Sequence, residues 1–510
     1  MMKKRNLFCS LNSSFELNQK GFQIYNIILF SALVFMLLSC STVVEEKKPN
    51  IIYILVDQWR ASATGYAGDP NVNTPNLDLL AKESFNFLNA VSVIPICTPY
   101  RASLMTGRFP TSTGMFLNDL HLPPTELCIG DALVSGGYQT GYIGKWHLDG
   151  HGRHSFIPKE RRRGFQYWKV AECDHNYNNS HYYSGDSDEK LYWDGYDVFA
   201  QTKDAQQYIR DHADADKPFA LFLSYGTPHF PHPTAPEEYK ERYPLDKIIL
   251  PANVPDSTIN ETLLLEAQGY YAHCEALDKS IGDLLATLDE MGLAENTLLV
   301  FTSDHGEMLG SHGVRAKAKQ VPLSESAMVP FLLRYPAIHG VKGTEITMPI
   351  NTPDIFPTLF GLAGLPIPAT VEGEDLSSVI IDGKERENRA VLYMNLAPFV
   401  KGEYGREYRA VKTPKYSYVR SLEGPWLLFD DIKDPLQMDN LVLNPEFSDL
   451  VGSMDKKLQE KLREIDDDFR PAQSYVEEWG LVLEPGGTIF YSTEVDTEPQ
   501  TPKRKSGNTK

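Results

Sequence analysis

The sequence predicts an α/β fold, with a large, mostly parallel sheet flanked by helices and a smaller C-terminal α+β subdomain that carries an antiparallel sheet. Short, continuous apolar runs are typical of parallel strands buried on both faces, and they occur at residues 51–56, 138–143, 219–224 and 298–301. Helical segments alternate with these runs, which is the pattern of βαβ units. Near Arg389 the pattern changes to short alternating segments separated by turns, which predicts a second, antiparallel sheet.

The predicted catalytic domain, residues 50–388, contains most of these alternating elements. Thr74, followed by a proline, is a typical start of a helix that carries one apolar stripe. A short helix is expected near residues 130–134, and a long amphipathic helix from about residue 261 to 291, closed by a glycine. Residues 150–200 are polar and rich in His, Tyr, Asn and Asp, which favours an insertion over the site, although a solvated loop fits the same composition.

A helix with unusual chemistry is expected to begin at Cys97. Thr98 and Pro99 are helix start signals, because proline is tolerated in a first turn, and Gly107 can end the helix. Unpaired N–H groups and the helix dipole make such a start attractive to anions, and Arg101 falls on the same helical face. A cysteine in this position would be activated or chemically converted. The alternative for a lone cysteine is a buried structural role.

The C-terminal subdomain is predicted over residues 389–480. Its strands are expected at residues 389–395, 408–412, 416–420 and 426–430, joined as an antiparallel meander. A helix from about residue 446 to 469 follows. Residues 481–510 form a C-terminal tail, of which about the last fifteen are polar and expected to be disordered.

The N-terminus has the layout of a secretory signal. Basic residues, beginning with Lys3, precede an apolar run at residues 27–38 that is short for a membrane span. The run ends in Leu-Leu-Ser-Cys, which resembles a bacterial lipobox and implies lipidation of Cys40. Residues 1–40 are therefore predicted to be a lipoprotein-type signal peptide and residues 41–49 a tether. The expected location is the periplasm or cell surface of a bacterium, with the lipid as the only membrane attachment; a simple cleaved signal or an anchor helix are the alternatives.

Composition restricts the possible partners. The 510 residues carry a formal net charge of −19, which argues against a nucleic-acid partner, since binding a polyanion needs a basic surface. A small anionic substrate remains possible, because a pocket can be locally positive on an acidic protein. Outside the segments discussed above, Cys128, Cys173 and Cys274 show no metal-ligand spacing and predict no disulfide framework.

Four of the apolar runs end in charged or imidazole side chains. Ligands of open α/β sheets bind at the carboxyl ends of the strands. We therefore expect these side chains to meet in one site; they are Asp57, Lys145 with His147, His229, and Asp304 with His305.

The segment Cys97-Thr98-Pro99-Tyr100-Arg101, followed by Leu-Met-Thr-Gly-Arg, resembles the maturation motif of the type I sulfatases, within the alkaline phosphatase superfamily. The resemblance extends over about residues 48–480. It implies an alkaline-phosphatase-like fold and oxidation of Cys97 to formylglycine by a formylglycine-generating maturation enzyme. The hydrated aldehyde would be the nucleophile that attacks the sulfur of a sulfate ester.

The resemblance also assigns roles to the other site residues. One divalent metal would be held by Asp57, Gln58, Asp304 and His305 together with the residue formed from Cys97. The predominance of oxygen ligands favours Ca²⁺ or another hard ion over zinc, and Ca²⁺ is the metal we expect. Further roles follow for the remaining side chains: Arg101 holds the nucleophile, Lys145 and Lys319 bind sulfate oxygens, His229 protonates the leaving alcohol, and His147 accepts a proton as sulfate leaves. Lys319 is placed by its spacing from Ser324-Glu325-Ser326, and Lys317 lies close by.

The expected function is hydrolysis of sulfate esters of a sulfated carbohydrate. The pattern departs from the commonest one of the arylsulfatases, which have two adjacent aspartates at Asp57-Gln58 and Asp-Asn at Asp304-His305. Some sulfatases share this departure, and so do phosphonate monoester hydrolases that use the same formylglycine, so a phosphonate or phosphate ester hydrolase is the alternative. A catalytically dead glycan-binding lipoprotein is a third possibility, against which the intact motif at Cys97 argues.

Overall fold

The computed structural model describes residues 47–398, 406–494 and 496–505. The predicted signal peptide with Cys40, and most of the tether, lie outside the described residues. The main element of the described chain is one ten-stranded sheet. From one edge to the other its strands are β11 (Thr344–Ile346), β2 (Phe85–Phe87), β10 (Phe331–Arg334), β9 (Thr297–Ser303), β1 (Asn50–Asp57), β8 (Phe219–Pro228), β4 (Gln139–Lys145), β5 (Tyr167–Ala171), β6 (His181–Ser184) and β7 (Leu191–Tyr192).

The middle of this sheet is parallel, which confirms the predicted fold class. β9, β1, β8, β4 and β5 run in the same direction, each beside the next. Antiparallel pairs occur toward the edges, where β10 pairs with β9 and with β2, and β6 pairs with β5 and with β7. Four of these strands, β9, β1, β8 and β4, are the ones that the continuous apolar runs predicted, whereas β5 lies in the segment predicted to be a polar insertion.

Strand β1 shows why these runs are apolar throughout. Alternate side chains of a strand point to opposite faces of the sheet. Tyr53 and Leu55 pack into the core on one face, and Ile52 and Ile54 into the core on the other face. All eight residues of β1 are buried, and between Asn50, which begins the strand, and Asp57, which ends it, no position is left for a charged residue.

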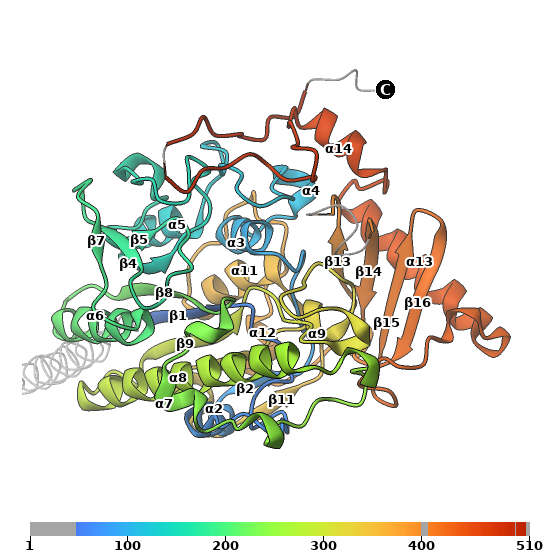
Figure 1. Ribbon diagram of the computed structural model, residues 1–510. Coiled ribbons are helices and arrows are strands. Elements are labelled where there is room, and N and C mark those ends of the chain that lie inside the picture. The colour runs from blue at the N-terminus through green and yellow to red at the C-terminus, as the bar shows by residue number, and fades with distance from the viewer. Residues whose placement is uncertain (1–46, 399–405, 495, 506–510) are drawn as a thin grey trace, which may run out of the picture. The chain divides into compact units, whose positions relative to one another are not determined.

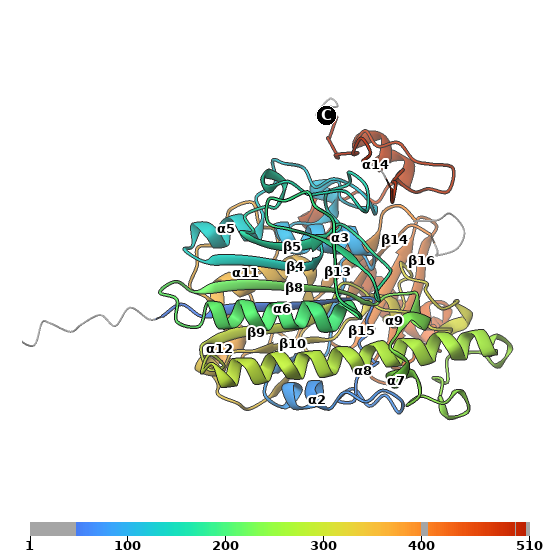
Figure 2. The same ribbon diagram turned by 60° about the vertical axis from the view of Figure 1, so that its left-hand side comes forward.

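Helices cover both faces of the sheet. The face of Tyr53 is covered by α3 (Cys97–Thr106), α5 (Ile129–Ser135) and α11 (Thr352–Leu362), and the opposite face by α2 (Pro75–Lys82), α6 (Asp197–Asp211) and α8 (Glu261–Glu290). Figure 2 shows α3 and α5 on one side of the sheet and α6 and α8 on the other. Helix α8 has the predicted length, and it is capped by Asn260, whose side chain accepts a hydrogen bond from the N–H of Leu263.

Smaller elements complete the large domain. They are the two-stranded pair of β3 (Ala90–Val91) and β12 (Ile350–Asn351), and the short helices α4 (Pro110–Thr113), α7 (Glu237–Lys240), α9 (Ser324–Ala327), α10 (Pro336–His339) and α12 (Ser377–Asp382). The predicted insertion at residues 150–200 contains β5, β6 and β7, which extend the main sheet at one edge. The insertion is therefore more regular than its polar composition indicates.

The C-terminal meander has the predicted order. β13 (Val391–Asn395), β14 (Tyr408–Lys412), β15 (Tyr416–Ser421) and β16 (Gly424–Asp430) form a separate four-stranded antiparallel sheet, followed by α13 (Ser448–Glu464) and α14 (Ala472–Glu478) (Figure 1). Helix α13 is shorter than the predicted 446–469, because Asp466 and Phe469 have left-handed backbone angles that a helix cannot continue through.

The end of the chain differs from the sequence expectation. Residues 496–505 were expected to be disordered, but they lie against the large domain and against the end of α14, without forming regular secondary structure. Backbone N–H groups of Thr497 and Lys503 donate to the carbonyls of His151 and Trp479, at 2.7 and 3.2 Å. Composition could not reveal these contacts, because they use backbone groups that every residue possesses.

Among the described residues, no helix combines the length and the apolar character that crossing a membrane requires.

Candidate functional site

The four strands predicted to end in functional side chains are consecutive in the sheet. β9, β1, β8 and β4 lie side by side and run in the same direction, so their carboxyl ends share one edge. Asp57 ends β1 and Lys145 ends β4, while Asp304 directly follows β9 and His229 directly follows β8. The structure therefore brings together at one edge the side chains that the sequence distributes over nearly 250 positions.

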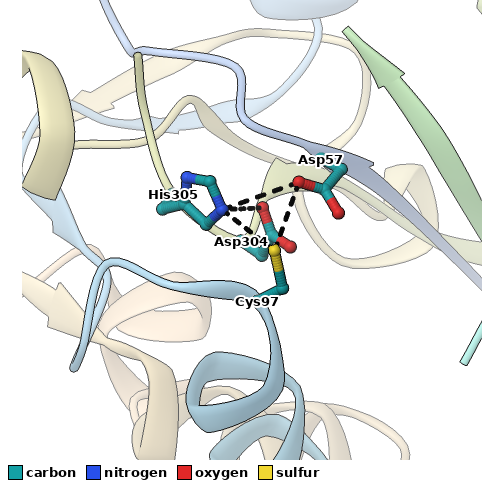
Figure 3. A group of neighbouring side chains, drawn as sticks. All are labelled: Asp57, Cys97, Asp304 and His305. Carbon is teal, nitrogen blue, oxygen red and sulfur yellow. Dashed lines mark hydrogen bonds and ion pairs between the residues drawn. The ribbon is translucent and has the colours of Figure 1, made fainter. Parts of the chain in front are cut away.

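Helix α3 brings Cys97 to this edge. Cys97 is the first residue of the helix, and its side chain is buried. Its Sγ lies 3.6 Å from Asp57 Oδ1 and 3.3 Å from His305 Nε2 (Figure 3). As predicted, the helix ends at Gly107, which has a left-handed φ of 66°. A Cβ at this position would lie 2.9 Å from the side chain of Val371, so glycine is required for space as well as for backbone conformation.

Arg101, one turn after Cys97, holds the strand ends together. Its Nη2 donates to Asp57 Oδ2 and to Asp304 Oδ2, both at 3.2 Å, and its Nη1 donates to the carbonyl of Lys145 at 2.9 Å. Lys145 Nζ donates to the same Asp57 oxygen at 2.7 Å. Burial opposes ionisation of Asp57, but Lys145 and Arg101 hold the pKa of its carboxyl well below the usual range.

The carboxylate oxygens of Asp57 and Asp304 that do not pair with Arg101 both face the imidazole ring of His305. Asp57 Oδ1 and Asp304 Oδ1 lie 3.5 and 3.6 Å from His305 Nε2 (Figure 3). The other ring nitrogen, Nδ1, lies 2.9 Å from the carbonyl of Gly306, which can only accept, so Nδ1 carries the hydrogen. Burial lowers the pKa of His305, which leaves Nε2 without a hydrogen.

This geometry fits a metal ion. Candidate ligand atoms of Asp57, Cys97, Asp304 and His305 all lie within 4.8 Å of one another. A lone pair on Nε2 that faces two carboxylate oxygens is repelled by both unless a cation lies between them. The donor set of carboxylates and one imidazole can bind a divalent ion.

Gln58 is oriented by a residue that the sequence analysis missed. Its side-chain Nε2 donates a very short hydrogen bond to the buried carboxylate of Glu307, and its Oε1 accepts from Lys319 Nζ at 3.2 Å. Its backbone N–H donates to Asp304 Oδ1 at 3.0 Å, with a left-handed φ of 69°. Because Glu307 holds the NH₂ group, the amide oxygen of Gln58 is the atom left available to a cation.

Of the two neighbouring lysines, Lys319 points into the site and Lys317 points to another partner. Lys319 Nζ is 3.5 Å from Cys97 Sγ and 2.9 Å from His229 Nε2. Lys317 instead pairs with Glu266 at 2.7 Å. Burial, reinforced by the ammonium of Lys319, holds the pKa of His229 well below its ordinary value. In this state Lys319 donates and His229 Nε2 accepts.

His147 has a carboxylate partner that was not predicted. Its Nε2 lies 3.1 Å from Asp119 Oδ1, and Arg153 donates to both oxygens of Asp119 at 2.9 Å. Burial opposes charge on the His147 ring, but nearby Cys173 and the hydrogen bond to Asp119 raise its pKa above the ordinary value. The opposite nitrogen, Nδ1, is buried and has no hydrogen-bond partner.

Sequence reasoning thus missed three residues that support the site. Glu307 lies two positions beyond His305, in the segment already identified, so its proximity to the predicted ligands was an available signal. Asp119 and Arg153 lie in irregular segments that follow no apolar run. Nothing in the local pattern distinguishes them from solvated polar residues.

Comparison with protein families gives two matches. The family model described as "Sulfatase" matches residues 49–365, and the model described as "N-sulphoglucosamine sulphohydrolase, C-terminal" matches residues 310–464. Together these regions include every residue of the site described above.

Individual proteins are similar over most of the chain. An ulvan-active sulfatase of Formosa agariphila is 50% identical and is aligned over 88% of this chain and 89% of its own length. An endo-4-O-sulfatase of Bacteroides thetaiotaomicron is 30% identical over 83% of this chain and 93% of its own. A solved structure described under glycosaminoglycan metabolism by Bacteroides thetaiotaomicron superposes with a TM-score of 0.75 at 29% identity, covering 85% of this chain and 98% of that chain.

The same fold occurs in an enzyme of different specificity. The crystal structure of a phosphonate monoester hydrolase of Agrobacterium radiobacter superposes with a TM-score of 0.64 at 21% identity, over 82% of this chain and 96% of that one. At this identity the likeness concerns the fold alone.

Proposed function

This chain belongs to the sulfatase family and is a sulfuric ester hydrolase, and we propose that its substrate is a sulfated carbohydrate. The names of its relatives support this substrate class: one is active on ulvan, and another comes from glycosaminoglycan metabolism. The observation that carries the proposal is the cluster of Cys97, two carboxylates and His305 at the start of a helix, with Lys145 and Lys319 beside it.

We further propose that Cys97 is oxidised to formylglycine by a maturation enzyme and that the adjacent cluster holds Ca²⁺. Asp57, Gln58, Asp304 and His305 would supply the protein ligands, of which three are oxygen donors, the type that calcium prefers. When bound, the metal supplies charge neutralisation, so that an anionic ester can approach a nucleophile. Arg101 pairs with one oxygen of each of the two carboxylates and so fixes their orientation relative to each other.

The remaining side chains bind the sulfate and move protons. The ammonium groups of Lys145 and Lys319 lie beside Cys97 or Asp57 and would bind sulfate oxygens. His229 would protonate the leaving alcohol. An anionic sulfate next to the Lys319–His229 pair favours transfer of a proton to His229 Nε2, because it offsets the positive charge that now lowers the pKa of the ring. His147 would accept a proton at Nδ1 as sulfate is expelled.

The first test is an assay of protein co-produced with a formylglycine-generating enzyme. Sulfated mono- and disaccharides would be compared with aryl sulfate and aryl phosphonate esters. We expect sulfate release from at least one saccharide. The Cys97→Ala variant should lose turnover and keep its melting temperature, since alanine is well tolerated in a first helical turn. Turnover above a few per cent in this variant, or active protein in which peptide mass analysis finds Cys97 unmodified, would contradict the proposed nucleophile.

A phosphonate or phosphate ester is the second candidate substrate. The observation that favours it is the ligand set with Gln58 and His305, which gives the metal two carboxylates where the commonest arylsulfatase pattern has three. A metal site with less negative charge withdraws more electron density from the ester. Turnover of the phosphonate ester without release of sulfate from any saccharide would favour this candidate.

We also propose that the mature protein is exported and carries a lipid on Cys40. The support is the basic N-terminus, the short apolar run and the sequence Leu-Leu-Ser-Cys. Metabolic labelling with a radioactive fatty acid in a producing bacterium should label the protein and not the Cys40→Ala variant. Equal labelling of the two would place the lipid elsewhere, and absence of label in both would favour a simple cleaved signal.

A further inference from the structure

We propose that the end of the chain is a positioning element of the active site. Residues 482–494 and 496–505, here called the C-terminal strap, act through Tyr491 and Arg153 on Asp119, and through Asp119 on the orientation of the His147 ring. Figure 1 shows the strap in dark red, passing over α4. The strap lies beyond residue 464, where the family-model matches end, so it is not part of the matched family regions.

The strap is bonded to both loops that carry the positioning residues. The N–H of His121, two residues after Asp119, donates to the carbonyl of Gln500 at 3.0 Å. The N–H of Arg153 donates to the carbonyl of Ser492 at 2.8 Å, and the contact between Thr497 and His151 lies beside it. The strap therefore connects two loops that are more than thirty residues apart in the sequence and fixes their separation.

The guanidinium of Arg153 is held on two sides. Its carbon lies 3.7 Å from the centre of the Tyr491 ring, which is the geometry of a close cation–π contact. Its Nε and Nη2 form a bidentate salt bridge with the two oxygens of Asp119. A planar group fixed by a ring on its face and a carboxylate on its edge has little rotational freedom. The Asp119 carboxylate is fixed in turn.

Asp119 determines how the His147 ring points. Because a carboxylate only accepts, His147 Nε2 carries the hydrogen of their bond, and Nδ1 is left free. Asp119 and His147 both have left-handed backbone angles, with φ of 64° and 60°. Such conformations of residues other than glycine persist where the surroundings enforce them. The Arg153 pair and the strap are surroundings of this kind.

Tyr491 provides the means of testing this chain of contacts. It is 36% exposed, so its ring can be removed without opening the core. Phe490, its neighbour in the strap, is 59% exposed and serves as the matched control. Tyr491→Ala removes the aromatic ring that contacts Arg153, and Tyr491→Phe keeps it. Arg153→Lys keeps the positive charge but cannot form the bidentate salt bridge with Asp119.

The first measurement is spectroscopic and uses protein in which Cys97 is unmodified, so it does not depend on the proposed function. Selective ¹⁵N labelling of the 13 histidines, with His147 assigned through a His147→Gln variant, reports which ring nitrogen carries the hydrogen. We expect the Nε2–H form of His147 in the unaltered protein and in Phe490→Ala. In Tyr491→Ala and Arg153→Lys the signal should shift or broaden, and Tyr491→Phe should restore it.

The second measurement is kinetic and rests on the proposed role of His147. In matured enzyme, Tyr491→Ala should lower kcat about tenfold and Arg153→Lys up to about 100-fold. KM should change less than about twofold, because neither residue belongs to the proposed sulfate-binding pair, Lys145 and Lys319. Phe490→Ala should not change either constant. The proposal is overturned if the His147 signals are the same in all variants. Shifted His147 signals with unchanged kcat would support the positioning and contradict only the role of His147 in turnover.

Discussion

Glu307→Gln tests whether the carboxylate behind Gln58 sets the orientation of that amide. The substitution changes one oxygen to NH₂ without changing the shape of the side chain. Glu307 Oε1 accepts the backbone N–H groups of Leu309 and Lys317, at 2.9 and 2.7 Å, and Oε2 accepts the NH₂ of Gln58. A glutamine can keep the two backbone bonds through its oxygen. Its NH₂ group then faces the NH₂ group of Gln58, and two donors meet.

The expected loss of metal affinity follows from the two orientations that the side-chain amide of Gln58 can adopt in the variant. If the side-chain amide of Gln58 flips by about 180°, its oxygen accepts a hydrogen bond from the new NH₂ group of residue 307. Its own NH₂ group then faces the cation, so the metal loses one ligand. If the amide does not turn, a buried donor loses its partner, at a cost of about 1–3 kcal/mol. Either outcome weakens the metal site. Substitution of residues that orient metal ligands typically costs about 10–100-fold in affinity, which is about 1.4–2.7 kcal/mol.

The assay is calorimetric titration of Ca²⁺ into metal-free protein, followed by melting with and without the metal. We expect Glu307→Gln to weaken binding within this range and to lose part of the metal-dependent rise in melting temperature. Glu325→Gln is a suitable control, because Glu325 is a buried carboxylate that contacts Asn253 and not Gln58. Unchanged calcium affinity in Glu307→Gln, with the control also unchanged, would refute the orienting role.

Two further predictions concern stability. Burial raises the pKa of Asp197 to about 7 from its ordinary 3.8. The free energy of unfolding therefore falls as pH rises from about 4 to 7, because the unfolded chain ionises first, and it does not fall further above pH 7. Asp197→Asn has no carboxyl to ionise, so its free energy of unfolding relative to the unaltered protein, measured in denaturant, should rise by about 3 kcal/mol from pH 5 to pH 8. An equal difference at both pH values would show that the carboxyl is not protonated in the folded protein. Gly306→Ala would place a Cβ 1.9 Å from the carbonyl oxygen of Glu325 and should lower the free energy of unfolding by about 3 kcal/mol or more. Gly452→Ala in α13, where nothing lies within 4 Å, should be neutral or stabilising by up to about 1 kcal/mol, and equal effects of the two would contradict the close contact.

The sequence alone determined the fold class and the place of the site. A strand buried on both faces must be apolar along its whole length, so β1 and its parallel neighbours are visible as continuous runs. The first charged or imidazole residue after each run then lies at the strand's carboxyl end or directly beyond it. Asp57, Lys145, His229 and Asp304 were located by this reasoning before any spatial information, because one edge of a parallel sheet collects all such ends.

Only the tertiary structure decided which polar groups orient the site. Glu307, Asp119 and Arg153 act through hydrogen bonds to residues that lie between 28 and 249 positions away in the chain. Such bonds depend on the distance between two segments, and no local pattern of apolar and polar residues encodes that distance. Which of Lys317 and Lys319 lies beside Cys97 depends in the same way on how the loop folds: Lys319 contacts Cys97, and Lys317 pairs with Glu266.

Amino-acid composition did not predict the structure of the C-terminal strap. The polar composition of its last part, residues 496–505, predicted disorder, because such residues cannot form a core of their own. In the folded chain the strap is held by backbone hydrogen bonds to His121, His151 and Arg153, and by the contact of Tyr491 with Arg153. Those partners exist only once the large domain has folded. The sequence of a segment shows whether it can form a hydrophobic core of its own. Only the tertiary structure shows which hydrogen-bond partners and ring contacts the rest of the protein provides for it.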